Sequence, residues 1–252
     1  MSAATLRVMW LYPDHMNIYA DRGNIAMLER RCEWRGIGFE LGTAGPGEPV
    51  DPDAHDLFYM GGGQDRDQAL VARDLVEGKR DALAAALDSG ASMLAVCGGY
   101  QLLGHSYQLG EESLPGLGLV DLRTVREPGE RLIGNVVIEA DVGDGPRRLA
   151  GFENHGGRTY LGAGEQPLGR VVAGFGNNGK DGQEGVRRGR LVGTYLHGPL
   201  LPKNAWLADV LTGWALGRRT GTVPALEPLD DRLEEAAHES AARAALVPPG
   251  RR

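Results

Sequence analysis

The sequence contains few cysteines and no long apolar run, and each absence excludes a class of protein. Cys32 and Cys97 are the two cysteines among 252 residues, so the chain carries neither a disulfide framework nor a zinc site of paired CxxC motifs. No apolar run is long enough to cross a bilayer, and the start, MSAATLRVMW, lacks the charged and apolar regions of a signal peptide. We therefore expect a cytoplasmic protein.

Basic residues are also in short supply. The chain has 27 lysines and arginines against 34 aspartates and glutamates, a formal net charge of −7, so it lacks the electrostatic footprint of a nucleic-acid-binding protein. It contains no P-loop of the form GxxxxGK[ST], which argues against a complete ATP-dependent synthetase within this chain. Hydrophobic residues make up 42% of the sequence, which is typical of a soluble globular protein with a substantial core.

The first half of the sequence alternates strand-like and helix-like segments. Short apolar runs predict strands at Leu6–Leu11, Phe39–Leu41, Asp56–Met60 and Met93–Val96. Segments rich in helix formers lie between these runs, and a further helix is predicted at Tyr100–Gln108. This alternation predicts an α/β fold with a mostly parallel sheet and helices on both faces.

The second half is different, because several strand-like segments follow one another across glycine-rich turns. These segments are Leu132–Ala140, Arg170–Phe175 and Leu191–Leu196, and a helix is predicted after them at Asn204–Leu216. Strands joined by short turns can pair antiparallel, so we expect extra antiparallel strands in this half.

The composition changes again from Gly221 onward. Prolines come first, and then a charged, alanine-rich segment predicts a helix at Asp230–Leu246. We therefore divide the chain into one domain at residues 1–220 and a peripheral helix with a tail at residues 221–252.

The segment ASMLAVCGGYQLLG places a cysteine between a buried strand and two glycines. A sharp turn into a helix would lift the Cys97 side chain above the carboxyl edge of the sheet, where open α/β sheets carry their active sites. Gly98 and Gly99 permit a strained backbone, and the helix N-terminus favours the thiolate. The pattern is that of a nucleophile elbow with cysteine in place of serine, and with Ala95 where the first glycine usually stands. We predict that Cys97 is a nucleophile.

A cysteine that only fills the core is the alternative interpretation, since free cysteine is among the most buried residue types. Cys32 fits that alternative, because it shares a helical face with Ile25 and Leu28. We predict that Cys32 is a core residue.

A thiolate nucleophile usually needs a histidine as its base, and the chain has six histidines. His197 is the best candidate, because it ends the apolar run Leu191–Leu196 and Gly198-Pro199 stop the strand there. His155 is a competitor, because the glycines that follow it indicate a shaped pocket. The other four lie behind the elbow, between elements or in the charged tail, and they are His15, His55, His105 and His238.

A run of three glycines, Gly61-Gly62-Gly63, follows the strand at Asp56–Met60. Glycine backbones can present free N–H groups, so we predict that the Gly62 and Gly98 amides form an oxyanion hole beside Cys97. By itself a triple glycine is typical of a simple turn, so this prediction depends on the cysteine elbow.

Together these motifs resemble those of a known family. The loop YMGGGQD, the elbow VCGGYQLLG and the histidine in GTYLHGP resemble a class I, triad-type glutamine amidotransferase of the cobyric-acid-synthase-like branch. The segments LYPDHMNIYADRGN, ERLIGNVVIE and FENHGGRTYLG are similar to those of glutaminase subunits of lipid II isoglutaminyl synthases. The resemblance runs from about Leu6 to Leu216, and it implies a flavodoxin-like sheet flanked by helices.

The resemblance implies that the chain is a glutaminase that works through a cysteine thioester. Cys97 would attack the side-chain amide of glutamine, and His197 would shuttle protons. Arg131 in ERLIG would hold the α-carboxylate of glutamine, which a guanidinium can bind in bidentate fashion. Three further residues would line the glutamine pocket: Gln101, Asn154 and His155. The resemblance implies no metal ion and no cofactor in this chain.

The resemblance also implies a division of labour between two subunits of a heterodimer. Ammonia would pass to a Mur-ligase-like partner, MurT, which would bind ATP and Mg²⁺. The partner would activate the α-carboxyl of D-glutamate in the lipid II stem peptide and form D-isoglutamine. The pair would act in peptidoglycan biosynthesis at the inner face of the membrane, without this chain inserting into it.

One position departs from the family pattern. In most triad-type amidotransferases a glutamate two residues after the histidine orients the ring, and here that position is Pro199. Either another acid of this chain or an acid of the partner must take the role, and the resemblance favours the partner. Because an unoriented imidazole is a poor base, we expect weak glutaminase activity from the isolated chain and more activity in the complex.

Two other functions stay open at this point. The first is a glutaminase that serves a different amidation, such as corrinoid synthesis. The second is a non-catalytic α/β binding module in which Cys97 is a redox or packing residue.

Overall fold

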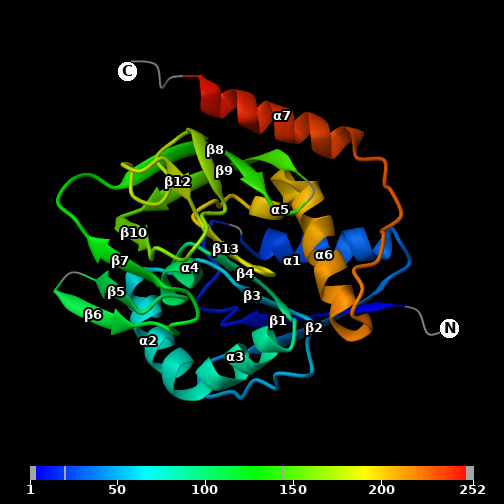
Figure 1. Ribbon diagram of the computed structural model, residues 1–252, viewed down its shortest axis with the longest axis horizontal. Coiled ribbons are helices and arrows are strands. Elements are labelled where there is room, and N and C mark those ends of the chain that lie inside the picture. Colours follow the sequence, from blue (N-terminus) through cyan, green and yellow to red (C-terminus); the bar gives the residue numbers. More distant parts are fainter. Residues whose placement is uncertain (1–3, 20, 110, 144, 248–252) are drawn as a thin grey trace.

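A computed structural model describes residues 4–247 except 20, 110 and 144. Its central element is a six-stranded sheet in the order β13-β14-β4-β3-β1-β2 (Figure 1). In chain order these strands are β1 (Thr5–Leu11), β2 (Gly38–Ala44), β3 (Leu57–Met60), β4 (Ser92–Val96), β13 (Val186–Arg188) and β14 (Leu191–Thr194). Five strands pair in parallel, and β13 pairs antiparallel at one edge. The predicted α/β fold with a mostly parallel sheet is confirmed.

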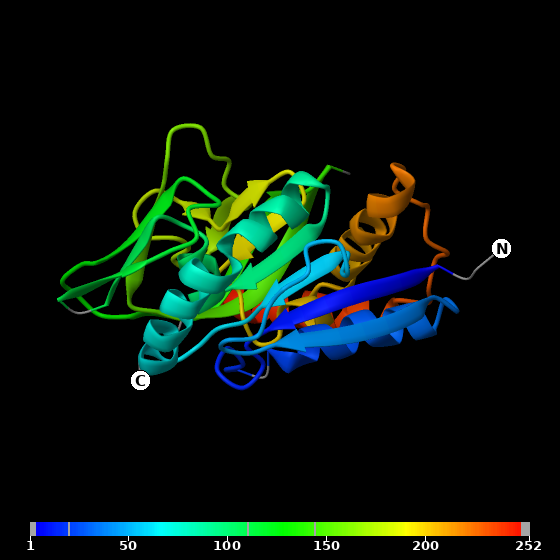
Figure 2. The ribbon, with the colours of Figure 1, turned by 90° about the horizontal axis from the view of Figure 1, so that it is seen from below.

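Helices cover both faces of this sheet (Figures 1 and 2). One face is covered by α1 (Arg22–Glu33) and α6 (Ala205–Thr220), which also contact each other. The other face is covered by a continuous helical segment made of α2 (Asp65–Asp74), the π-helical turn η1 (Leu75–Lys79) and α3 (Arg80–Asp88). Strands β3 and β4 are buried at every position, as expected for central parallel strands enclosed between two helical layers.

The second half of the chain adds two four-stranded sheets. One contains β5 (Ser106–Leu109), β6 (Glu112–Pro115), β7 (Leu122–Arg126) and β10 (Gly157–Leu161), and the other contains β8 (Leu132–Asp141), β9 (Pro146–His155), β11 (Gly169–Ala173) and β12 (Gln183–Glu184). All their pairings are antiparallel except that of β5 with β7. The expected antiparallel strands are therefore present, and the long hairpin β8–β9 is the largest addition.

The predicted helix at Tyr100–Gln108 is wrong in its length. The helix that follows β4 is short, α4 (Gly98–Leu102), and strand β5 begins only four residues after it. Gly104 lies in this turn, where a side chain would come within 2.2 Å of Leu122. The chain has to leave the helix there because β5 pairs with β6 and β7.

The parallel strands bring three segments of the active-site motifs to one edge of the sheet. Because β3, β4 and β14 run in the same direction, the residues that follow them, Gly61, Cys97 and the segment ending at His197, share the carboxyl edge. The hairpin β8–β9 joins this edge through a bridge between Phe152 and His197, whose backbones exchange hydrogen bonds of 3.1 and 2.8 Å. This edge therefore positions the candidate site.

The C-terminal part forms the predicted helix, α7 (Arg232–Leu246), which packs across β8 and β9 (Figure 1). Arg31 of α1, which is fully buried, ties the start of this part to the domain. Its guanidinium donates two hydrogen bonds of 2.6 Å to Asp209 of α6 and two bonds of 2.7 and 2.8 Å to Asp231. The domain boundary after residue 220 stays a prediction. No helix among the described residues is long and apolar enough to span a membrane.

We expect Arg31→Met to destabilise the protein by about 3 kcal/mol, because it leaves two carboxylates facing each other without their shared cation. The measurement is the free energy of unfolding from denaturant titration, with Arg30→Ala as the matched control. Arg30 lies next in the chain and pairs with Glu33 on the exposed face of α1, so its removal should cost less than about 1 kcal/mol. Equal losses for the two variants would contradict the anchoring role of Arg31.

Candidate active site

Cys97 occupies the turn between β4 and α4 with a strained backbone. Its φ of 51° and ψ of −104° lie in a region that a non-glycine residue adopts at a cost of about 1–3 kcal/mol. Its amide donates a 2.8 Å hydrogen bond to the carbonyl oxygen of Thr194 in the neighbouring strand, and the residue is 6% exposed. The predicted elbow is therefore present, with the thiol at the carboxyl edge of the sheet.

His197 lies beside this thiol and is fully buried. Burial alone lowers the pKa of His197, but the neighbouring Cys97 and the hydrogen-bonded Asp21 carboxylate raise this pKa to about 10. A raised histidine pKa keeps the imidazolium form at neutral pH and loses it only as the pH rises through about 10. Within the described residues, Nε2 of the ring has no hydrogen-bond partner of ordinary geometry, which leaves it free to exchange a proton with the reacting atoms.

Asp21 supplies the carboxylate that orients His197. Its two carboxylate oxygens lie 3.2 and 3.3 Å from Nδ1 of the ring, and the aspartate is fully buried. It belongs to the loop between β1 and α1, 176 residues away from His197 in the sequence. The sequence left open whether this acid belongs to this chain or to a partner, and the resemblance favoured the partner; the structure places an acid of this chain, Asp21, against the ring.

The triple glycine lets the loop after β3 pack against these two residues. A side-chain carbon on Gly61 would come within 2.4 Å of the Met16 carbonyl oxygen, and one on Gly62 would come within 2.7 Å of the His197 ring. The Gly62 amide donates a 3.0 Å hydrogen bond to Asp21. The prediction that this amide serves an oxyanion hole is therefore corrected, because its hydrogen already binds the orienting carboxylate.

The neighbouring amide of Gly63 is placed differently. A side-chain carbon on Gly98 would lie 3.1 Å from the Gly63 nitrogen, so the Gly63 backbone packs against Gly98 at the elbow. A hydrogen bond of 3.1 Å from the Gly99 amide to the Gly61 carbonyl oxygen holds the loop to the elbow. Gly63 thus replaces Gly62 as the partner of Gly98 in the candidate oxyanion hole.

A cleft of about 370 Å³ opens at this elbow. Five residues singled out from the sequence line it together: Cys97, Gln101, Arg131, Asn154 and His155. The cleft also contains residues that the sequence analysis did not select, among them Tyr19, Gly63 and Gln68. Within the described part of the chain, no group of three or more histidine, cysteine, aspartate or glutamate side chains is arranged to hold a metal ion.

Arg131 stands at the rim of the cleft on the side of the β8–β9 hairpin. Its Nε donates a 2.9 Å hydrogen bond to Oδ1 of Asn154, and a terminal nitrogen donates a 3.0 Å bond to the Asn154 carbonyl oxygen. Among the ion pairs of residues 4–247 that are described, none involves Arg131. The guanidinium therefore presents an uncompensated positive charge to an anionic ligand in the cleft.

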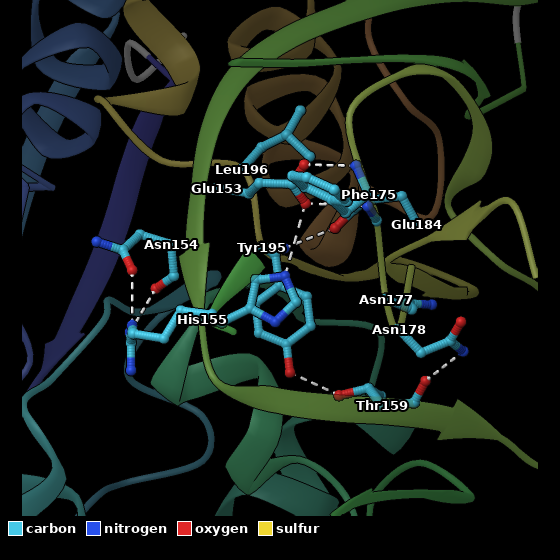
Figure 3. A network of polar contacts seen from close by, with 12 residues as sticks. Glu153, Asn154, His155, Thr159, Phe175, Asn177, Asn178, Glu184, Tyr195 and Leu196 are labelled. Atoms are coloured by element: carbon cyan, nitrogen blue, oxygen red, sulfur yellow. Dashed lines mark hydrogen bonds and ion pairs between the residues drawn. The ribbon is translucent and has the colours of Figure 1, made fainter. Parts of the chain in front are cut away.

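Gln101 and His155 belong to a buried polar network beneath the cleft. The Gln101 amide accepts a bond from Gln68 and donates one to the Tyr195 hydroxyl, both of 3.1 Å. The ring of His155 stacks on the Tyr195 ring with centroids 3.5 Å apart (Figure 3). Because both ends of the Gln101 amide already form hydrogen bonds within the protein, this side chain stabilises the floor of the cleft as well as lining it.

Two buried carboxyl groups complete the network on the far side of Tyr195 (Figure 3). Glu153 accepts hydrogen bonds from the amides of Phe175 and Gly176 at 2.6 and 2.9 Å. Glu184 accepts a 2.7 Å bond from the Tyr195 amide, and burial raises the pKa of Glu184 to about 8. Glu184 is therefore mostly protonated at neutral pH, which limits the buried charge beneath the site.

Cys32, His105 and His238 do not line the cleft. Cys32 is fully buried, and burial raises the pKa of its thiol to about 12, so the prediction of a core residue is confirmed. His105 is exposed and pairs with Asp121, and His238 bonds the carbonyl oxygen of Lys203. Neither can act on Cys97.

The arrangement of thiol, oriented imidazole and arginine at one sheet edge agrees with a family comparison. The model of the CobB/CobQ-like glutamine amidotransferase domain matches residues 7–205. The chain belongs to this family. The predicted family membership is thus confirmed, and the alternative of a non-catalytic binding module is set aside because the family consists of amidotransferases.

Three named proteins are similar to this chain to different extents. The chain is 41% identical over 215 residues to the GatD subunit of the glutamine-hydrolysing lipid II isoglutaminyl synthase of Staphylococcus aureus, covering 85% of this chain and 86% of that protein. It is 36% identical to the corresponding GatD subunit of Streptococcus pneumoniae, over 91% of this chain and 88% of that protein. A cobyric acid synthase of Rhodobacter capsulatus is 32% identical, but only 41% of its length is covered.

Solved structures agree on the fold. PurLQS from Thermotoga maritima superposes with a TM-score of 0.56 at 20% identity, covering 86% of this chain and 96% of that chain. A glutamine amidotransferase from the same organism superposes with a TM-score of 0.52 at 16% identity, covering 95% of this chain and 93% of that chain. At these identities the two structures bear on the fold alone.

Proposed function

We propose that this chain hydrolyses L-glutamine and supplies the ammonia with which a partner subunit amidates lipid II. The observation that carries the proposal is the buried constellation of Cys97, His197 and Asp21 at the end of a cleft whose rim holds Arg131. A thiolate, a histidine and an orienting acid are the parts that acyl transfer by a cysteine nucleophile requires. The Arg131 guanidinium, which forms no ion pair among the described residues, fits a substrate that carries a carboxylate at a distance from the reacting amide.

In the first half of the proposed reaction the Cys97 thiolate attacks the δ-carbonyl carbon of glutamine and forms a C–S bond. The carbonyl oxygen becomes an oxyanion, and the Gly63 and Gly98 amides donate hydrogen bonds to it. The His197 imidazolium gives its proton to the amide nitrogen. The C–N bond then breaks, ammonia leaves, and a γ-glutamyl thioester remains on Cys97.

In the second half water completes the cycle. Nε2 of His197 takes a proton from the water as its oxygen attacks the thioester carbon. The C–S bond then breaks, glutamate leaves with the added oxygen, and the thiolate–imidazolium pair is restored. Asp21 keeps Nδ1 of the ring protonated in both halves, so that Nε2 is always the nitrogen that exchanges the proton.

The proposed partner is a Mur-ligase-like subunit, MurT, in a heterodimer with this chain. The proposal rests on the relatives, which are named as subunits of lipid II isoglutaminyl synthases. The partner would bind ATP and Mg²⁺ and convert the D-glutamate of lipid II to D-isoglutamine, so the pair would work at the inner face of the membrane. Supply of ammonia for corrinoid amidation is the second candidate, because cobyric acid synthases also match this chain.

Isotope tracing tests the proposal with the full chain and its co-purified partner. Glutamine labelled with ¹⁵N in the side-chain amide should yield labelled D-isoglutamine in lipid II when ATP and Mg²⁺ are present, and labelled ammonia when lipid II is omitted. Lipid II that stays unamidated while glutamine is hydrolysed would remove the cell-wall proposal. Labelling of a corrinoid in the same mixture would favour the second candidate.

A further inference from the structure

Tyr19 has a backbone conformation that requires support from its surroundings. It lies in the loop that joins β1 to α1, two residues before Asp21, and it lines the cleft. Its φ is positive, at 52°. Among the described non-glycine residues, Tyr12 and Cys97 are the others with a positive φ. Such a conformation persists only where the surrounding contacts fix it, so the contacts of Tyr19 indicate what it does.

The hydroxyl end of Tyr19 fixes the side chain that holds Arg131. Nδ2 of Asn154 donates a 2.5 Å hydrogen bond to the Tyr19 hydroxyl, while Oδ1 of the same amide accepts from Nε of Arg131. A guanidinium has only donors, so a flipped amide would turn its own N–H groups toward Arg131. Arg131 therefore decides which end of the amide faces it, and the Tyr19 oxygen accepts from the N–H end, so the Asn154 amide is held at both ends.

The residues on either side of Asn154 in β9 do not hold the Asn154 amide. Glu153 and His155 flank Asn154 in the strand, and both are buried in the network around Tyr195, although His155 also lines the cleft (Figure 3). Their contacts hold the backbone of the strand in place. Because successive side chains of a strand point to opposite faces, the Asn154 side chain lies on the other face and is not held by them. The side chain of Asn154 depends on contacts on the cleft side, and Tyr19 provides one of them.

The ring end of Tyr19 covers the catalytic histidine. The Tyr19 and His197 rings meet edge to face with centroids 5.0 Å apart and an interplanar angle of 60°. Tyr19 is 43% exposed, whereas His197 is fully buried, so a partly exposed ring packs against the buried imidazole. Edge-to-face packing of this kind favours one ring orientation.

We propose that Tyr19 is a positioning residue that couples the two halves of the glutamine site. Its hydroxyl orients Asn154 and through it the carboxylate-binding guanidinium of Arg131. Its ring holds and shields His197 beside Cys97. This inference rests on the proposed glutaminase function and adds a residue to that site that neither the sequence motifs nor the family comparison assigns.

The roles of the Tyr19 hydroxyl and of the Tyr19 ring can be tested separately by treating the full chain with two electrophiles. The first, 6-diazo-5-oxo-L-norleucine, carries the α-carboxylate of glutamine and alkylates the thiolate with loss of N₂, and the second, iodoacetamide, has no carboxylate. We expect Tyr19→Phe to weaken the saturation constant for the first reagent about tenfold, because the orienting hydrogen bond is lost. The same variant should leave the iodoacetamide rate unchanged. Tyr19→Ala should also slow the iodoacetamide reaction, because the ring over His197 is removed.

The matched control is Tyr160→Phe, which removes a hydroxyl bonded to Glu127 outside the cleft and should change neither reagent's kinetics. Asn154→Ala should weaken the saturation constant like Tyr19→Phe, and the double variant should be no worse than either single one. An unchanged saturation constant in Tyr19→Phe would overturn the inference while leaving the glutaminase proposal intact. Absence of labelling at Cys97 in the unmodified chain would instead overturn the glutaminase proposal.

Discussion

Cys97→Ser should abolish glutamine hydrolysis, with a loss of kcat of at least about a thousandfold. The His197 imidazolium is matched to a thiolate, which it can stabilise at neutral pH, whereas a serine hydroxyl keeps its proton there. Glutamine should still bind, because Arg131 and the rest of the cleft are untouched. The measurements are glutamate release by the full chain with its partner and glutamine affinity by calorimetry.

The control for this prediction is Cys32→Ala. Cys32 is buried in the core beside α6 and far from the cleft lining, so the variant should lose some stability and retain hydrolysis in the folded fraction. Hydrolysis that survives Cys97→Ser and disappears with Cys32→Ala would reverse the assignment of the nucleophile.

Asp21→Asn should lower kcat by about a thousandfold, by comparison with the loss of an orienting acid in other triads. An asparagine can present an N–H group to Nδ1 and so favour the wrong tautomer of the ring. It also removes one of the two neighbours that raise the pKa of His197. The pH at which the imidazolium loses its proton should therefore fall below about 10, and the alkaline limit of activity should shift in the same direction.

Rates measured from neutral to alkaline pH in both proteins test this prediction. Asp14→Asn is the matched control, since Asp14 lies in the same loop with its side chain exposed, and it should leave the pH profile unchanged. If Asp21→Asn retains full activity when the partner is bound, the partner supplies the orienting acid and the role of Asp21 is structural.

The elbow was predictable because its determinants are local. A buried strand, a cysteine, two glycines and a helix follow one another in the sequence, and together they define the backbone of Cys97. His197 was predictable for a similar reason, because it lies three residues after the end of β14, the strand that pairs with β4. The parallel order of the sheet then brings the two side chains together.

Asp21 was not predictable in this way, because its role depends on a contact across 176 residues. The only local signal was an acid in a loop at the end of a strand. Pro199 stands where most relatives of the family have the orienting acid, which left either another acid of this chain or one of the partner, and the resemblance favoured the partner. In the structure Asp21 lies in the loop between β1 and α1, and this loop contacts His197 at the sheet edge.

Gly62 illustrates a second limit. The glycine run correctly indicated a loop beside the elbow, but it could not show that the Gly62 amide donates to a carboxylate. The short α4 illustrates a third limit, because the residues predicted to continue this helix to Gln108 instead pair as β5 with β6 and β7. In both cases tertiary contacts decided between locally acceptable structures.

The central claim is that the sulfur of Cys97 carries the glutamyl group during hydrolysis. Acid quenching of the full chain with its partner during turnover, followed by peptide mass mapping, tests it most directly. We predict a γ-glutamyl thioester on the peptide that contains Cys97 and none on the peptide that contains Cys32. Steady glutamine hydrolysis without any glutamyl adduct on Cys97 would contradict the account.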